Sequence, residues 1–189
     1  MAKLYFKYGV MGSSKTAEAL MTRYRYEEIG QKALLCKTDI DQRDGELIIR
    51  SRIGLEGQCM LISQLRQMSN EDIKQYDAII VDEAQFASIS DIDFLSDVVD
   101  NLDVPVICYG LKADFRNRLF PGSKRLLEIA DKIEEVKTVC WCGRKALCNA
   151  RYDKNGIIRE GNQVALGSND SYVALCRKHY KLGMLEKPN

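Results

Sequence analysis

The sequence predicts an α/β fold, in which a parallel sheet is covered by helices, followed by a small cysteine-rich domain. Short apolar runs alternate with amphipathic segments along the first part of the chain, as is typical of parallel strands joined by helical crossovers. The 189 residues and 46% hydrophobic content are enough to bury a core and exclude a disordered chain. The composition changes near Cys140, so we expect a main domain at residues 1–139 and a small one at 140–189.

Five short apolar runs are the expected strands of the sheet, and three longer amphipathic segments are the expected helices. The strands are predicted at residues 4–8, 33–36, 59–62, 78–81 and 104–109. The helices are predicted at residues 16–29, with Leu20, Met21 and Tyr24 on one face, at 63–75, and at 90–101, with Ile92, Leu95, Val98 and Val99 apolar. Gly30 should end the first helix. The charged stretch at 38–57 has no clear period, and a loop of that length is expected to be mobile or functional.

Composition and charge narrow the function classes. No apolar run approaches the roughly 18 residues that a membrane helix needs, and no signal peptide precedes the first strand, so we expect a cytoplasmic protein with no membrane partner. A net charge of +1 gives no overall indication of nucleic-acid binding. The seven cysteines should be reduced, and would serve as core residues, catalytic groups or metal ligands. Any histidine-dependent chemistry must use His179, the single histidine.

The turn between the first strand and the first helix carries a phosphate-binding pattern. This turn nearly matches the P-loop pattern G-x-x-x-x-G-K-[ST]. Its residues are Gly9, Val10, Met11, Gly12, Ser13, Ser14, Lys15 and Thr16. In that pattern the backbone amides and the helix N-terminus bind phosphate oxygens, the lysine spans the β- and γ-phosphates, and the threonine hydroxyl holds magnesium. Ser14 stands where the pattern has its second glycine, so a side chain occupies a tight bend. The alternative to a phosphate-binding loop is an ordinary loop of small residues, followed by a helix that has lysine in its first turn.

A second motif strengthens the nucleotide interpretation. The apolar strand at 78–81 runs into Asp82 and Glu83, which is the Walker B arrangement, and its aspartate engages magnesium, usually through water. Glu83 is then placed to act as a base. Acidic residues also commonly end strands that meet solvent, but the two motifs together favour a magnesium–nucleotide site.

Two pairs of residues near the C-terminus have the spacing of metal ligands. Cys140-x-Cys142 and Cys176-x-x-His179 supply three thiolates and one imidazole, a set that structural zinc prefers. Cys148 is a rival ligand, but it lies in a strand-like run where a buried thiol is the ordinary outcome. The remaining cysteines, which lie in or beside core strands and should pack there, are Cys36, Cys59 and Cys108. Asn155-Gly156 predicts a type I′ hairpin turn within this domain.

Several segments together resemble one family, the zinc-containing (type II) thymidine kinases of bacteria and animals. These segments follow the family's order and spacing over nearly the whole chain. They are residues 8–16, 81–86, 109–111, 114–116, 142–146 and 171–180. The resemblance implies transfer of the ATP γ-phosphate to the 5′-hydroxyl of thymidine, giving dTMP. It implies a parallel P-loop (RecA-like) sheet flanked by helices, with a small C-terminal zinc-ribbon-like lasso domain. The implied cofactors are a structural zinc ion and magnesium with ATP.

The resemblance also implies roles for individual residues. Glu83 matches the catalytic base, and Thr16 and Asp82 match magnesium ligands. The implied ATP-binding residues are those of the P-loop, with Arg43, Asp82, Glu83, Ala84 and Gln85. The implied thymidine-binding residues are Met11, Phe86, Leu111, Phe115, Phe120, Gln163, Val164, Ala165, Leu166, Gly167 and Tyr172. The implied zinc ligands, which would anchor both ends of a base-gripping loop at 161–172, are Cys140, Cys142, Cys176 and His179.

Two other classes of function stay open at this point. Another P-loop ATPase would turn over ATP without a nucleoside. A zinc-ribbon nucleic-acid binder is suggested by residues 140–189, which carry a net charge of +5, but such a protein needs neither the P-loop nor Asp82 and Glu83. We therefore expect ATP and thymidine as partners and no nucleic acid. The resemblance further implies a homotetramer and raises dTTP as a feedback inhibitor.

Overall fold

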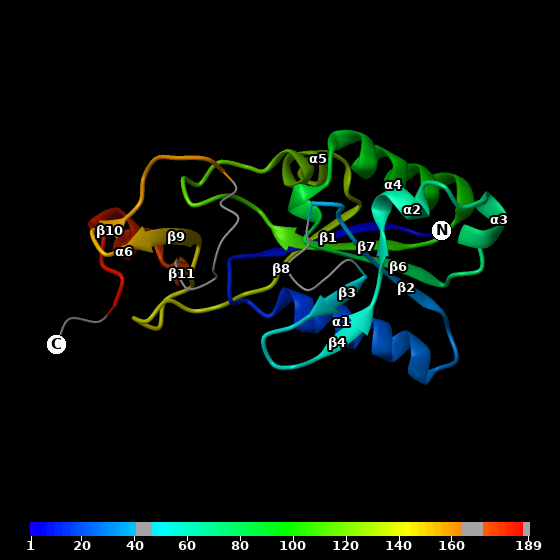
Figure 1. Ribbon diagram of the computed structural model, residues 1–189, viewed down its shortest axis with the longest axis horizontal. Coiled ribbons are helices and arrows are strands. Elements are labelled where there is room, and N and C mark those ends of the chain that lie inside the picture. Colours follow the sequence, from blue (N-terminus) through cyan, green and yellow to red (C-terminus); the bar gives the residue numbers. More distant parts are fainter. Residues whose placement is uncertain (41–46, 164–171, 187–189) are drawn as a thin grey trace.

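The computed structural model describes residues 1–40, 47–163 and 172–186 of the chain. Its main sheet has six parallel strands in the order β5-β2-β6-β7-β1-β8, as the alternation of strands and helices predicts (Figure 1). The strands are β1 (Leu4–Gly9), β2 (Ala33–Lys37), β5 (Met60–Leu61), β6 (Ala78–Asp82), β7 (Val106–Leu111) and β8 (Lys132–Glu135). The sequence does not predict β8, because this edge strand has a single apolar residue, Ile133.

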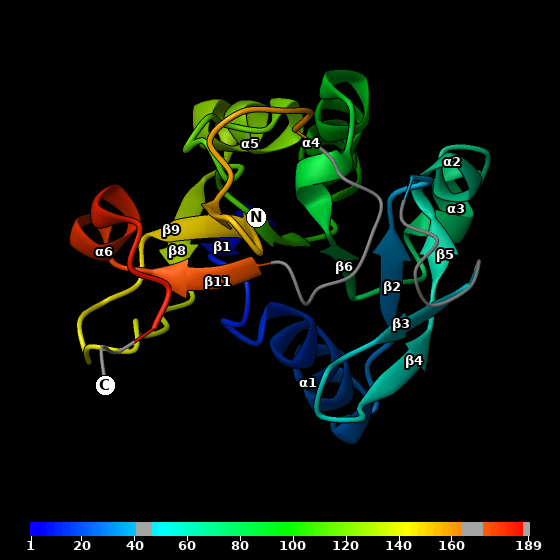
Figure 2. The same ribbon diagram turned by 60° about the vertical axis from the view of Figure 1, so that its left-hand side comes forward.

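Helices cover both faces of the main sheet, and each face has its own apolar core. α1 (Lys15–Glu28) packs on one face, and α4 (Ile89–Leu102) and α5 (Pro121–Ile129) pack on the other, as Figure 2 shows. β6 contributes to both cores, because successive side chains of a strand point to opposite faces. The P-loop and Walker B strands are therefore fixed from both sides. No helix among the described residues is both long and apolar enough to cross a bilayer.

The predicted apolar faces of the helices are partly confirmed. α4 buries Ile92, Leu95, Val98 and Val99, as predicted. In α1, Leu20 is buried, but Met21 is 44% exposed and Tyr24 is 60% exposed, so the prediction is wrong for these two residues. The helix turns its small residues to the sheet instead, because alanines allow the close approach of the two backbones. Gly30, with φ 77°, follows the end of α1 as predicted.

The middle of the chain differs from the sequence prediction in two ways. The helix expected at 63–75 is two short helices, α2 (Ile62–Leu65) and α3 (Asn70–Ile73). Ser69 separates them, because its side chain accepts a hydrogen bond from the Asp72 backbone N–H and caps α3. The stretch expected to be a loop contains an antiparallel hairpin of β3 (Ile48–Arg50) and β4 (Glu56–Gln58), and Ile49 is buried against the α1 face.

The C-terminal part forms a second, smaller lobe, here called the metal lobe, which comprises residues 140–163 and 172–186. Its sheet has the order β10-β9-β11 and is separate from the main sheet (Figure 1). Its elements are β9 (Cys148–Asp153), β10 (Gly156–Ile157), β11 (Tyr172–Leu175) and α6 (Arg177–Leu182). The hairpin predicted at Asn155-Gly156 is present, but the prediction of a type I′ turn is wrong. That turn needs a positive φ at both central residues, and Gly156 has φ 114° whereas the φ of Asn155 is not positive. A domain boundary at residue 139 stays a prediction.

Candidate active site and metal centre

The P-loop residues lie together at the carboxyl end of β1, where ligands bind in open α/β sheets. Gly9 has no room for a side chain, since a Cβ there would lie 2.6 Å from the Val136 carbonyl oxygen. Gly12 and Ser14 both adopt a left-handed backbone, with φ values of 74° and 62°. Glycine adopts this conformation freely, but serine is strained in it. The bend predicted at Ser14 is therefore present, and the Ser14 side chain makes no hydrogen bond that caps α1.

Lys15 is held inside the loop that precedes it. Its Nζ donates hydrogen bonds to the Val10 carbonyl at 2.9 Å and to Ser13 Oγ at 3.2 Å. The residue is buried, so its charge is already largely removed from water. A buried ammonium at a helix N-terminus suits a phosphate, because the anion would replace neutral acceptors with full negative charge.

The Walker B strand brings its acidic end to the start of α1. β6 ends at Asp82, which is buried, and β7 lies between β6 and β1 in the sheet. The Thr16 side chain lies close enough to the Asp82 carboxyl to lower its pKa, so the two nucleotide motifs are neighbours in space. Burial, followed by the charge of Glu83, raises the pKa of Asp82 to about 7, against the opposing effects of Thr16 and Lys15.

Glu83 follows Asp82 in a left-handed conformation, with φ 51°, at the start of a short 3₁₀ helix, η1 (Ala84–Phe86). The Gln85 side chain contacts Glu83, since Gln85 Nε2 donates a hydrogen bond to Glu83 Oε2. The other end of the same amide accepts the Leu111 backbone N–H at 3.0 Å. Gln85 therefore lies between the predicted base and a predicted residue of the thymidine pocket.

The residues predicted to bind thymidine come from several elements. Phe86 and Phe120 make an edge-to-face contact with ring centroids 5.8 Å apart. Phe115 is buried beneath the guanidinium groups of Arg116 and Arg151, 5.4 and 4.9 Å from its ring. Met11, Leu111 and Tyr172 are half-buried. Arg43 and residues 164–167 lie outside the described residues.

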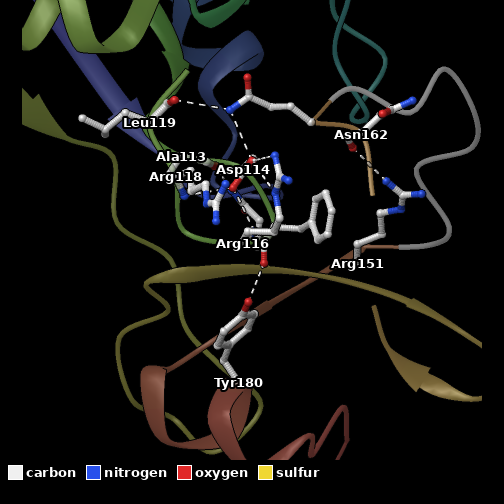
Figure 3. A network of polar contacts seen from close by, with 11 residues as sticks. Ala113, Asp114, Arg116, Arg118, Leu119, Arg151, Asn162 and Tyr180 are labelled. Carbon is white, nitrogen blue, oxygen red and sulfur yellow. Dashed lines mark hydrogen bonds and ion pairs between the residues drawn. The ribbon is translucent and has the colours of Figure 1, made fainter. Parts of the chain in front are cut away.

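A polar network joins the loop after β7 to Gln163, a residue of the predicted thymidine loop (Figure 3). At its centre the buried Asp114 carboxylate accepts backbone N–H groups from Arg116 and Arg118, both at 2.9 Å. Gln163 Nε2 donates to Asp114 Oδ2 at 3.2 Å and to the Leu119 carbonyl at 3.3 Å. The sequence predicts Gln163 as a site residue, but it does not reveal this contact, which spans 49 residues.

Asn149 is a functional candidate that sequence reasoning missed. It is buried on β9 of the metal lobe, and its Oδ1 accepts the Met11 backbone N–H of the P-loop at 2.7 Å. Its Nδ2 donates to the Ala113 carbonyl at 2.9 Å, after β7. One amide thus connects the metal lobe to two loops of the main sheet. An asparagine between Cys148 and Ala150, two residues that pack in the small core, is the only signal in the sequence, and it is a weak one.

The four predicted metal ligands converge. The ligand atoms of Cys140, Cys142, Cys176 and His179 all lie within 4.8 Å of one another, and they are the only such cluster in the described part of the chain. His179 Nδ1 lies 3.5 Å from both Cys140 Sγ and Cys176 Sγ, and Cys142 Sγ lies 4.0 Å from Cys176 Sγ. Tetrahedral Zn²⁺ spaces its sulfurs by about 3.8 Å and sulfur from nitrogen by about 3.5 Å, so the donor set fits zinc. Cys148 lies on β9 outside the cluster, as favoured from the sequence.

Local structure explains the convergence of the ligands. Cys140 and Cys142 lie on a tight turn that Gly143 closes in a left-handed conformation, with φ 81°. Cys176 occupies the N-cap position of α6, and the nearby His179 backbone N–H lowers the pKa of the Cys176 thiol. The Trp141 ring stacks on the His179 imidazole with centroids 4.0 Å apart and fixes its orientation.

The fold and these two sites define a P-loop protein with a Cys₃His cluster that could hold a metal ion. The thymidine kinase family model matches residues 2–180. The chain is 46% identical to the thymidine kinase of Streptococcus gordonii, over 95% of this chain and 96% of that protein. It is 44% identical to the thymidine kinase of Legionella pneumophila, over 98% and 92%. The chain belongs to the thymidine kinase family.

A solved structure of the replication initiator DnaA bound to AMPPCP and single-stranded DNA also aligns with the chain. Its TM-score is 0.47 at 16% identity, over 72% of this chain and 41% of that one. At this level of similarity the alignment adds nothing to the assignment.

Proposed function

We propose that this protein transfers the γ-phosphate of ATP to the 5′-hydroxyl of thymidine, with Glu83 as the base that takes the hydroxyl proton. The observation that supports this most strongly is the placement of Asp82, which ends β6 beside Thr16 of the P-loop and directly before Glu83. A base must lie within hydrogen-bond reach of the proton that it removes. Family membership supports the choice of thymidine as the acceptor.

The phosphate groups of ATP would lie against the P-loop. Backbone amides from Gly12 to Thr16 and the Lys15 ammonium would bind the phosphates, with Arg43 as a further cation. Thr16 and Asp82 offer the oxygen ligands that Mg²⁺ prefers, and they would hold the ion that accompanies ATP. Magnesium supplies charge neutralisation for the transferred phosphoryl group. The raised pKa of Asp82 fits such a site, because a nearby cation would favour the charged carboxylate.

Thymidine would bind between the loop after β7 and the metal lobe. Leu111 ends β7, Phe115 and Phe120 lie in the loop after it, and Tyr172 and Gln163 belong to the metal lobe. We propose that Val164 to Gly167 present backbone groups to the edge of the base. Zinc would have a structural role, because its ligands flank the segment that the base would contact on both sides.

Transfer of label from [γ-³²P]ATP distinguishes this function from its alternatives. Incubation with thymidine should place the label in dTMP. Label released as free phosphate without a nucleoside would indicate another P-loop ATPase. Affinity for nucleic acid that falls steeply with salt would favour the zinc-ribbon alternative. A panel of nucleosides in the same assay measures the selectivity for thymidine over deoxyuridine.

The resemblance supports three further parts of the proposal. The chain would act in the cytoplasm and assemble as a homotetramer, and dTTP would inhibit it by feedback. Size-exclusion chromatography with light scattering tests the tetramer, and the label-transfer assay at increasing dTTP concentrations tests the inhibition.

A further inference from the structure

One buried amide side chain links the predicted base to the wall of the predicted thymidine pocket. Gln85 is only 1% exposed. Its Nε2 donates to Glu83 Oε2, and its Oε1 accepts the Leu111 backbone N–H at 3.0 Å. Both ends of the amide are therefore engaged by the protein itself.

The two partners fix the orientation of the amide. If Gln85 were flipped, its oxygen would face the Glu83 carboxylate and its NH₂ group would face the Leu111 N–H, so both contacts would become repulsive. The observed orientation is the one that satisfies an acceptor on one side and a donor on the other. A donor held in this way defines the direction in which the Glu83 carboxylate points.

Gly110 shows how closely the surrounding strand fits this side chain. A Cβ on Gly110 would lie 2.7 Å from Gln85 Oε1 and 3.1 Å from the Gln85 backbone nitrogen. Gly110 does not have a positive φ, so the close approach of Gln85 explains the glycine here, and backbone conformation does not. β7 therefore leaves space for the amide at the place where it bonds to both Glu83 and Leu111.

We infer that Gln85 is a positioning residue that orients the Glu83 carboxylate relative to the substrate wall at Leu111. This inference rests on the proposed role of Glu83 as the base. It differs from the role in ATP binding that the family resemblance implies, because a buried amide with both ends bonded to protein is not directed at phosphate. The base and the pocket wall then move as one unit, and the distance from the carboxylate to the 5′-hydroxyl is set before the substrate arrives.

Two substitutions at Gln85 separate positioning from ATP binding. Gln85→Met keeps the length of the side chain and removes both hydrogen bonds, and kcat should fall about tenfold or more, with KM for ATP nearly unchanged. Gln85→Glu keeps the shape but places a second carboxylate beside Glu83. Deprotonation of the base becomes harder, so the acid limb of the kcat–pH profile should move up by about one pH unit. Gln64→Met is the matched control, since Gln64 also accepts a backbone N–H but lies on α2, away from the site.

A third variant displaces the Gln85 amide by a substitution at a neighbouring residue, so that Gln85 itself is unchanged. Gly110→Ala should displace Gln85 and lower kcat in the same way as Gln85→Met, with thermal unfolding measured in parallel. Gly57→Ala is the control, because a Cβ there is also crowded, at 3.1 Å from the Leu20 and Leu35 side chains, but is remote from Glu83. Adding Gln85→Met to Gly110→Ala should cause little further loss, since both act on one contact.

Three results would overturn the inference. A rise in KM for ATP with kcat retained would assign Gln85 to ATP binding. An acid limb in Gln85→Glu that coincides with that of the unmodified protein would remove the link to the base. Full activity in a folded Gly110→Ala would show that the position of the amide does not matter. Failure of the proposed function is distinct, because the unmodified protein would then form no labelled dTMP.

Discussion

The main sheet and the metal lobe position their functional residues by different means. β6, which carries Asp82, is buried along its whole length between two cores. The metal lobe buries seven residues in its core, and two of them, Cys140 and Cys176, are also predicted metal ligands. A segment of this size cannot bury enough apolar surface to be stable alone. Hydrophobic packing therefore places the candidate phosphate site, whereas the metal lobe would depend in part on a metal ion bound by its four candidate ligands.

The difference shows which perturbations should stay local. Substitutions at the candidate phosphate site should change activity but leave the fold intact, because the sheet holds the backbone in place. Loss of a bound metal should instead destabilise the metal lobe itself, because the ligands would no longer be held together. The two regions meet at Asn149 and at Gln163, so effects should pass between them at these contacts.

Glu83→Gln should give the largest effect and leave both lobes folded. The amide retains the shape of the side chain but cannot accept the hydroxyl proton, so kcat should fall by about two to four orders of magnitude. ATP binding should persist, as measured by titration with a fluorescent nucleotide. Turnover close to that of the unmodified protein would refute the role of Glu83 as the base.

Removal of the metal should affect the two substrates unequally. Chelation, or Cys142→Ser, should release about one equivalent of zinc, raise KM for thymidine strongly, and raise KM for ATP less. Metal content by mass spectrometry and steady-state kinetics are the measurements. Cys148→Ala serves as a control, because this buried thiol lies outside the cluster and the variant should keep its zinc. Unchanged thymidine affinity after loss of zinc would contradict the structural role of the metal.

Asn149→Leu should reveal how far the lobes are coupled. The change leaves the Met11 N–H and the Ala113 carbonyl without their partner, at a cost of about 1–3 kcal/mol for each group that stays buried. Since Met11 belongs to the P-loop, KM for ATP should rise about threefold to tenfold although Asn149 lies in the metal lobe. Asn155→Ala, on the exposed hairpin turn of the same lobe, should leave KM unchanged. An ATP affinity that does not respond to Asn149→Leu would show that this contact does not couple the metal lobe to the P-loop.

Asp82 should make stability of the ligand-free protein depend on pH. Its pKa is about 7 in the fold and 3.8 in a free side chain, so the folded state favours the protonated form. This contribution is complete below about pH 4 and is lost as pH rises towards about 7. Asp82→Asn removes it, so the variant should gain stability relative to the unmodified protein by about 3 kcal/mol between about pH 5 and pH 8. Urea denaturation at both pH values measures this difference, and parallel pH dependence of the two proteins would contradict the raised pKa.

Ser14→Gly should have the smallest effect. Glycine adopts the left-handed conformation without strain, so the free energy of unfolding should rise by about 1 kcal/mol and activity should stay similar or increase. Ser14→Ala keeps the Cβ and removes the hydroxyl, and should show no such gain. A large loss of activity in both variants would mean that the Ser14 hydroxyl makes a contact essential for turnover.

Much of the site could be predicted because its residues are close together in the sequence. The P-loop, Asp82-Glu83, and the cysteine pairs are each short motifs whose chemistry depends on local spacing. The alternation of buried strands and amphipathic helices likewise predicts the sheet, since each element reflects its own burial pattern. Elements with weak patterns escaped prediction, such as β8 with its single apolar residue and the β3–β4 hairpin with its many charges.

The sequence by itself determined that phosphate, acidic and metal-ligand motifs exist in this chain, because short-range spacing sets their chemistry. Only the tertiary structure decided how they are joined. The contacts of Gln85 with Leu111, of Asn149 with Met11, and of Gln163 with Asp114 span 26, 138 and 49 residues. Hydrogen bonds of such range depend on which strand ends meet at one edge of the sheet, and no local pattern in the sequence carries that information.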